Sequence, residues 1–84
     1  MRDLKAALRT ALTTRFGVAP ETLTDDSELF SSGLIDSMSV ITLVSFLETE
    51  LGVPIPPTDI TLENLDSISR IATYATRLTG KQST

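Results

Sequence analysis

Three stretches of this chain carry apolar residues at helical spacing, and each of them ends at a glycine. They are residues 3–15 with Gly17, residues 37–51 with Gly52, and a stretch that begins at Asp66 or Ser67 and ends at Gly80. Glycine often follows the last residue of a helix because it adopts the left-handed conformation without strain. No segment has the alternating pattern of a strand. The sequence therefore predicts an all-α fold whose helices bury their apolar faces against one another.

The same spacing predicts which side of each helix is buried. In the first helix this side comprises Leu4, Leu8, Ala11 and Leu12. In the second helix it comprises Ile41, Val44, Leu47 and Leu51, joined by Leu43. In the last helix it comprises Ile68, Ile71, Ala72, Ala75 and Leu78, with Tyr74 at the edge. Asp3 and Asp36 are the expected N-caps of the first two helices, and Asp66 or Ser67 is the expected N-cap of the last helix.

Residues 17–36 form a long loop between the first two helices. Their content of Pro, Gly, Ser, Thr and Asp argues against a helix, and a bare loop of this length is uncommon in a small domain. We therefore expect its apolar residues to pin it across the helices. These residues are Val18, Leu23, Leu29, Phe30, Leu34 and Ile35.

The chain after Gly52 turns a corner before the last helix. Its prolines force extended backbone, and residues 58–60 then allow a single helical turn. The complete pattern predicts a small bundle of three main helices plus one short helix, with a long first loop. We expect a single domain over residues 1–80 and a frayed tail at residues 81–84.

Composition excludes several classes of function. The 84 residues contain no cysteine and no histidine, and their net charge is −4. Disulfides, thiolate nucleophiles and most metal sites are thereby excluded, and the commonest general base is missing. The acidic balance, without any cluster of Lys and Arg, argues against binding to nucleic acid. No apolar run reaches the about 20 residues of a membrane span, and no signal peptide is apparent, so we expect a monomeric cytoplasmic protein with no membrane partner.

Ser37 is the candidate for chemistry, because it lies where the loop after Gly33 meets the second helix. As a nucleophile it would need a base within reach, but the chain has no histidine and its lysines lie near the termini. A serine hydrolase is therefore disfavoured, and we do not expect an enzyme. As an acceptor Ser37 is well placed, because the N-terminus of a helix favours an attached phosphate. The residues alone also allow a third interpretation, in which Ser37 only helps to cap the helix.

The segment from Leu29 to Met38, LFSSGLIDSM, resembles the modification site of the acyl and peptidyl carrier proteins. That family has an apolar pair, a glycine a few residues later, and then Asp-Ser-Leu or Asp-Ser-Met at the start of its second helix. Two further segments are similar to the family, namely residues 46–56 at the end of the second helix and residues 62–68 before the last helix. The resemblance extends over nearly the whole chain.

The resemblance implies that Ser37 carries a 4′-phosphopantetheine arm. A separate phosphopantetheinyl transferase would attach the arm from coenzyme A with its own magnesium and base, and Asp36 and Met38 would face this enzyme. The thiol of the arm would hold an acyl or aminoacyl group as a thioester. A loading ligase or acyltransferase and a downstream condensing or transfer enzyme would then be the partners, and the chain itself would be a carrier.

The second helix departs from that of the fatty-acid carriers, which is typically acidic. Here its only acids are Glu48 and Glu50, near its far end. This departure favours a specialised pathway, such as secondary-metabolite, polyketide or aminoacyl transfer, over housekeeping fatty-acid synthesis. A helical interaction module without a covalent arm is the alternative of another class. We expect a mostly apolar partner face of Met38, Val40, Ser45 and Ile60, with partial burial against the first loop as the alternative for Val40.

Overall fold

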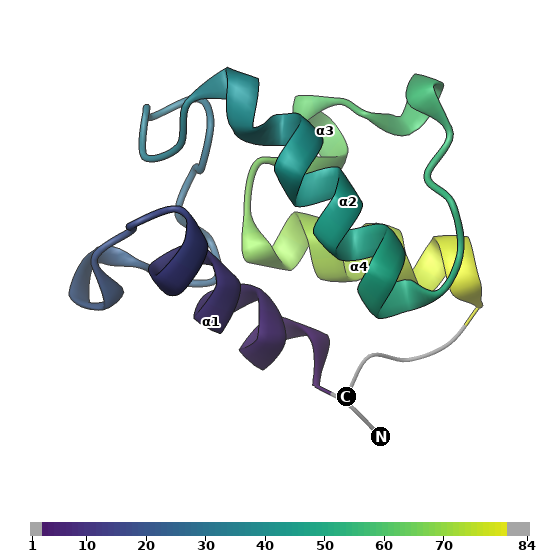
Figure 1. The fold of residues 1–84 in the computed structure, drawn as a ribbon, viewed down its shortest axis with the longest axis horizontal. Coiled ribbons are helices and arrows are strands. Elements are labelled where there is room, and N and C mark those ends of the chain that lie inside the picture. The colour runs from purple at the N-terminus through teal and green to yellow at the C-terminus, as the bar shows by residue number, and fades with distance from the viewer. Residues whose placement is uncertain (1–2, 81–84) are drawn as a thin grey trace.

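The computed structural model describes residues 3–80, and this part of the chain contains helices and turns but no strand. Three helices of 12 residues each form its frame, namely α1 (Leu4–Arg15), α2 (Val40–Leu51) and α4 (Ile68–Thr79). The connections contain the four-residue helix α3 (Leu62–Leu65) and 3₁₀ turns at Pro20–Thr22, Ser37–Ser39 and Pro57–Asp59. In Figure 1, α2 crosses in front of α4, with α1 lower and α3 near the top. The predicted all-α bundle is confirmed.

Polar caps and glycines delimit the main helices. At the start of α1, the Asp3 carboxylate accepts a hydrogen bond from the Lys5 N–H at 3.1 Å. At the start of α4, the Ser67 hydroxyl accepts one from the Arg70 N–H at 3.1 Å. Of the two candidate caps for the last helix, Ser67 is therefore the cap. The predicted tail at residues 81–84 lies outside the described residues.

The short elements agree only in part with the prediction. The expected single turn at residues 58–60 is present as the 3₁₀ turn Pro57–Asp59. Helix α3 was not predicted, because four residues are too few to show a helical period. It begins at the cap Thr61, whose hydroxyl accepts a hydrogen bond from the Asn64 N–H at 3.3 Å.

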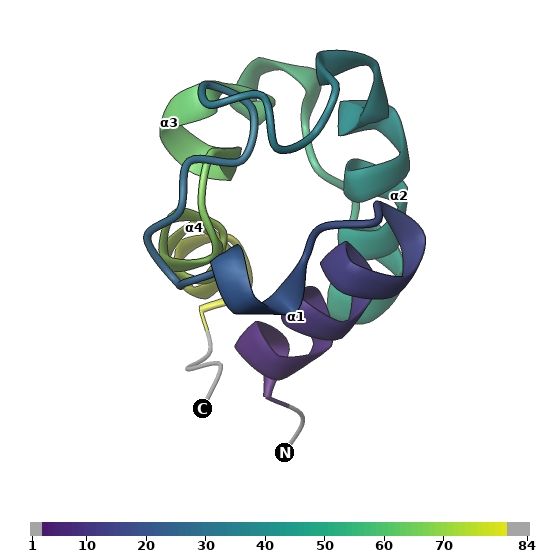
Figure 2. The ribbon, with the colours of Figure 1, turned by 90° about the vertical axis from the view of Figure 1, so that its left-hand side faces the viewer.

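One apolar core lies between the helices and the first loop, which together surround a common centre in Figure 2. The largest fully buried side chains are Leu8, Leu12, Leu29, Leu43, Leu47, Leu65, Ile68 and Ile71. The loop contributes Val18, Leu23, Leu29 and Ile35 to the core, as predicted, and Phe30 is half-buried. The prediction was wrong for Leu34, which is 37% exposed, and for Tyr74, which is buried rather than at the edge.

The predicted buried side of α2 was placed about one residue too far along the helix. Ile41 was expected in the core but is 69% exposed, while Leu43 and Leu47 are fully buried. Val40 and Val44 are half-buried and pack against the core. Successive residues of an α-helix are rotated by about 100°, so a buried side centred between Leu43, Val44 and Leu47 leaves Ile41 facing solvent.

Candidate functional site

Ser37 is the first residue of the 3₁₀ turn that leads directly into α2. Asp36 caps this turn, as predicted, because its carboxylate Oδ1 accepts a hydrogen bond from the Met38 N–H at 3.1 Å. The Asp36 carbonyl also accepts one from the Ser39 N–H at 2.8 Å. Both Asp36 and Ser37 are exposed. The structure thus presents the Ser37 hydroxyl at an accessible corner, with the α-helix itself beginning three residues later than the sequence suggested.

The cap determines what the start of α2 offers to an anion. The N–H groups of Met38 and Ser39 are already bonded to Asp36. An anion on Ser37 would therefore interact with the dipole of the helix and would lie near the carboxylate of Asp36, which is a like charge.

The loop before Ser37 is held by a buried carboxylate that the sequence analysis had considered only as a cap. Asp66, which is 5% exposed, lies between α3 and α4. Its Oδ1 accepts hydrogen bonds from the N–H of Phe30 at 2.7 Å and the N–H of Ser31 at 3.0 Å. Its carbonyl accepts one from the Leu29 N–H at 2.7 Å. Asp66 thus fastens the loop to the junction between α3 and α4.

The protonation state of Asp66 follows from these contacts. Burial by itself raises the pKa of this carboxyl group. Hydrogen bonds from Ser31 and Phe30, together with the charge of Arg70, outweigh burial and place the pKa below its ordinary value. Asp66 therefore remains ionised near neutral pH, and its hydrogen bonds to the loop are charge-assisted.

Between Ser31, which is bonded to Asp66, and Ser37, the loop makes a tight turn at Gly33. The Gly33 N–H donates to the Phe30 carbonyl at 3.2 Å, and the Ile35 N–H donates to the Leu29 carbonyl at 2.8 Å. Gly33 has a φ of 84°, a backbone conformation that favours glycine. The turn returns Ile35 to the core and directs the following residues, Asp36 and Ser37, outward.

A mostly apolar groove of about 190 Å³ opens beside Ser37. Phe30, Ser37 and Val40 line one wall. Ile60, Thr61, Leu62 and Leu65 line the other wall. The structure therefore brings Ser37, Val40 and Ile60 to the same groove, although Ile60 lies 23 positions after Ser37 in the sequence.

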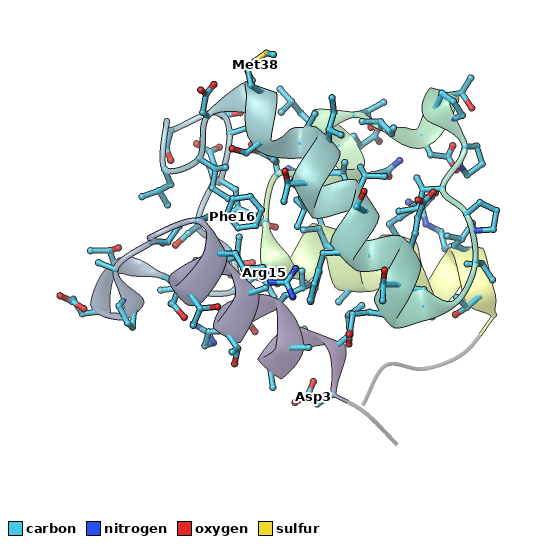
Figure 3. The ribbon with its side chains drawn as sticks, in the orientation of Figure 1. Asp3, Arg15, Phe16 and Met38 are labelled. Carbon is cyan, nitrogen blue, oxygen red and sulfur yellow. The ribbon has the colours of Figure 1, made fainter. Side chains whose placement is uncertain are left out.

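The residues of the predicted partner face differ in their exposure. Met38 is 75% exposed and projects away from the start of α2 in Figure 3. Ser45 is exposed and Ile60 is 36% exposed. Val40 is half-buried and packs against the core, in line with the burial alternative. Arg15 of α1 also approaches α2, with its guanidinium carbon 5.5 Å from the centre of the Phe46 ring.

Two exposed apolar residues near Ser37 were missed by the sequence analysis. Ile41 is 69% exposed and Leu62 is 54% exposed. Ile41 would have been found if the buried side of α2 had been centred one residue earlier. No sequence signal marks Leu62, because its helix is too short to show which side faces solvent.

The chemistry of the site centres on the exposed hydroxyl of Ser37. A Ser-His triad cannot form, since the chain has no histidine. Within residues 3–80, no group of His, Cys, Asp and Glu side chains could hold a metal ion. Over the same residues, every helix is too short or too polar to span a bilayer.

Residues 6–75 match the family described as the phosphopantetheine attachment site. Because the match covers more than half of the chain, the chain belongs to this family of carrier proteins. Its members carry covalently attached 4′-phosphopantetheine and are carriers rather than catalysts. The family interacts with transferases and biosynthetic enzymes. The exposed Ser37 and the groove beside it lie inside the matched residues.

The chain is also similar to the lincomycin biosynthesis protein LmbN of Streptomyces lincolnensis. The two sequences are 40% identical over 60 residues, which cover 71% of this chain and 22% of that protein. The chain therefore spans about a fifth of the length of this relative.

Proposed function

We propose that Ser37 is the attachment residue and that the chain carries acyl or aminoacyl groups as thioesters on the arm attached there. The observation that carries this proposal is the exposed Ser37 hydroxyl at the start of α2, within the residues that match the family. The residues around it fit the group, because the corner leaves the hydroxyl open and the adjacent groove is mostly apolar.

Attachment is a transfer of phosphopantetheine from coenzyme A to this hydroxyl. The Ser37 Oγ forms a bond to the phosphorus next to the pantetheine, the pyrophosphate bond breaks, and adenosine 3′,5′-bisphosphate leaves. The proton of the hydroxyl must pass to a base, and the chain has no histidine that could accept it. A separate phosphopantetheinyl transferase therefore supplies the base and the magnesium ion, and it contacts Asp36 and Met38 on either side of the serine.

The intact mass of the purified chain tests this assignment after incubation with coenzyme A and a promiscuous transferase. We expect the wild type to gain the mass of one phosphopantetheine and Ser37→Ala to gain nothing. Ser39→Ala is the matched control, because it removes a hydroxyl from the same turn and should still be modified. A modified Ser37→Ala variant would contradict the assignment. A folded wild type that stays unmodified would favour an interaction module without an arm.

The enzymes that act on the arm dock on the surface around Ser37. We define the docking face as Met38, Ile41 and Leu62, the most exposed large apolar side chains of residues 3–80. Ser45 follows Ile41 by one helical turn, and Ile60 lines the groove together with Leu62. Residues 37–47 contain no charged side chain. The docking face therefore offers burial of apolar area rather than charge to a partner.

These partners belong to a specialised biosynthetic pathway. They comprise a loading ligase or acyltransferase and a downstream condensing or transfer enzyme. The uncharged docking face and the similarity to a lincomycin biosynthesis protein support this proposal. Mass analysis of the thioester on protein purified from its own cells identifies the cargo. A series of saturated acyl chains that differ by two carbons would instead assign the chain to fatty-acid synthesis.

A further inference from the structure

One wall of the groove beside Ser37 is formed by a segment that contains only very short helical elements. This wall segment, residues 57–65, comprises the 3₁₀ turn Pro57–Asp59 and the four-residue helix α3. Helices of this length are not stable by themselves. Ile60 and Leu62 are 36% and 54% exposed, so Leu65, at 1%, is the main apolar anchor of the segment. The position of the wall therefore depends on its polar contacts with α4.

Three side chains of α4 supply such contacts. Arg70 Nη1 donates a hydrogen bond to the Glu63 carbonyl at 3.2 Å. The Tyr74 hydroxyl donates a hydrogen bond to Asp59 Oδ2 at 2.7 Å. Arg77 Nη2 donates to Asn64 Oδ1 at 3.0 Å, and Asn64 Nδ2 donates in turn to the Asp59 carbonyl at 2.9 Å. Asp59 is thus tied to α4 directly through Tyr74 and indirectly through Asn64.

The bond from Tyr74 is the strongest of these three contacts. Tyr74 is 4% exposed, whereas Arg70 and Arg77 are exposed. Burial of Tyr74 and its contact with the Asp59 carboxylate raise the pKa of its hydroxyl to about 12. The hydroxyl therefore remains protonated at ordinary pH and donates to a carboxylate from a largely buried position, where such a bond is strong.

We propose that the Tyr74–Asp59 hydrogen bond is a latch that fixes the wall segment against α4 and thereby sets the width of the groove beside Ser37. Tyr74 acts as a positioning residue, since it does not itself line this groove. When the latch is broken, the Tyr74 ring stays packed and Asp59 is released, so that the wall with Ile60 and Leu62 can move away from Ser37. The importance of this movement for the arm rests on the proposed function, whereas the latch itself is a property of the unmodified protein.

Amide hydrogen exchange on the unmodified protein tests the latch. In Tyr74→Phe we expect the amides of the wall segment, such as those of Ile60 and Leu65, to exchange about tenfold faster, the effect of one lost hydrogen bond. Ala11→Gly in α1 is the control for a general loss of stability. It should accelerate the core amides that exchange through global unfolding and leave the wall segment unchanged. Equal acceleration of the wall segment in both variants, or none in Tyr74→Phe, would overturn the proposal.

A double-variant comparison tests the partnership of the two side chains. Asp59→Ala and Tyr74→Phe should accelerate exchange of the wall segment to a similar extent, and the double variant should add little to either. The NMR signals of Phe30 and Val40 on the facing wall should shift in both single variants. Additive effects, or shifts confined to α4, would refute the latch. These measurements need no arm, so failure of the latch is distinguishable from a failure of Ser37 to be modified.

Discussion

Replacement of Asp66 tests how the loop before Ser37 is held in place. The carboxylate accepts two hydrogen bonds from backbone N–H groups of this loop, those of Phe30 and Ser31, and it is 5% exposed. Asp66→Ala removes the acceptor and leaves both N–H groups without it. Asp66→Asn keeps a neutral acceptor oxygen of the same shape and removes only the charge. The two variants therefore separate the hydrogen bonds from their charge assistance.

The expected loss of stability follows from these contacts. A hydrogen bond to a charged group contributes about 1.5–3 kcal/mol, and a buried donor without a partner costs about 1–3 kcal/mol. Phe30 is half-buried and Ser31 is exposed, so water partly replaces the lost acceptor. We expect Asp66→Ala to lower the free energy of unfolding by about 3 kcal/mol and Asp66→Asn by about 1 kcal/mol. For a domain of 84 residues, with a total of about 4–13 kcal/mol, the first loss is large.

The pH dependence of stability independently tests whether the ionised Asp66 carboxylate stabilises the fold. Despite burial, the hydrogen bonds to Asp66 place its pKa in the folded state below the ordinary value. Such a group stabilises the fold above the unfolded pKa of about 3.9, and its contribution is lost as the pH falls through the folded pKa. The wild type should therefore lose stability below about pH 4 more steeply than Asp66→Asn does.

Urea unfolding followed by far-ultraviolet circular dichroism measures both effects. Glu63→Gln is the matched control, because it neutralises an exposed carboxylate close by in the sequence. It should change the free energy of unfolding by less than about 0.5 kcal/mol. If Asp66→Asn unfolds at the same urea concentration as the wild type and with the same pH dependence, the carboxylate does not hold the loop and the reasoning is refuted.

Three further predictions concern the latch, the turn and the docking face. The raised pKa of Tyr74, about 12 against 10.0 in the unfolded chain, means that wild-type stability is fully present below pH 10 and falls as the pH rises toward 12. Urea titrations should show a loss of about 3 kcal/mol over this window, and Tyr74→Phe should lack it. Gly33→Ala should lower the thermal midpoint through about 1–2 kcal/mol of backbone strain alone, since no atom would contact the added Cβ at its φ of 84°. Met38→Ser and Ile41→Ser should raise the KM of the transferase for the carrier, and the circular dichroism of the carrier should stay unchanged. The wild-type rate should change only modestly with salt, because Asp36 is the one charged residue among residues 36–47. A steep fall of this rate with salt would contradict the apolar docking face.

The parts of the fold that rest on local chemistry could be predicted from the sequence. Helices α1 and α4 show their apolar period over 12 residues and have a polar cap at the start. The cap Asp36 is equally local, since its side chain bonds an N–H two residues away. The register of α2 could not be predicted as well, because this helix is apolar on more than one side. Tertiary packing decided that Leu43 and Leu47 rather than Ile41 enter the core.

The contacts that shape the site join residues far apart in the sequence, which explains why they escaped prediction. Asp66 bonds Phe30 and Ser31 across more than 30 positions, and Tyr74 bonds Asp59 across 15. Each of these side chains has an ordinary local interpretation, Asp66 as a cap and Tyr74 as an edge residue. Only the folded chain distinguishes a cap from a carboxylate that fastens a distant loop.

The surroundings of Ser37 divide into a firmly held side and a weakly held side. On one side, Asp66 fastens the loop before the serine, and the fully buried Leu43 and Leu47 anchor the helix after it. On the other side, the wall segment is held by Leu65 and by polar contacts that include the bond from Tyr74. A carrier needs a fixed point for its arm and a neighbourhood that adapts to successive partners. It follows that substitutions of Asp66 should lower the stability of the whole domain, whereas loss of the Tyr74 hydroxyl should chiefly alter the groove, and the two classes of variant can be separated by comparing global unfolding with local exchange.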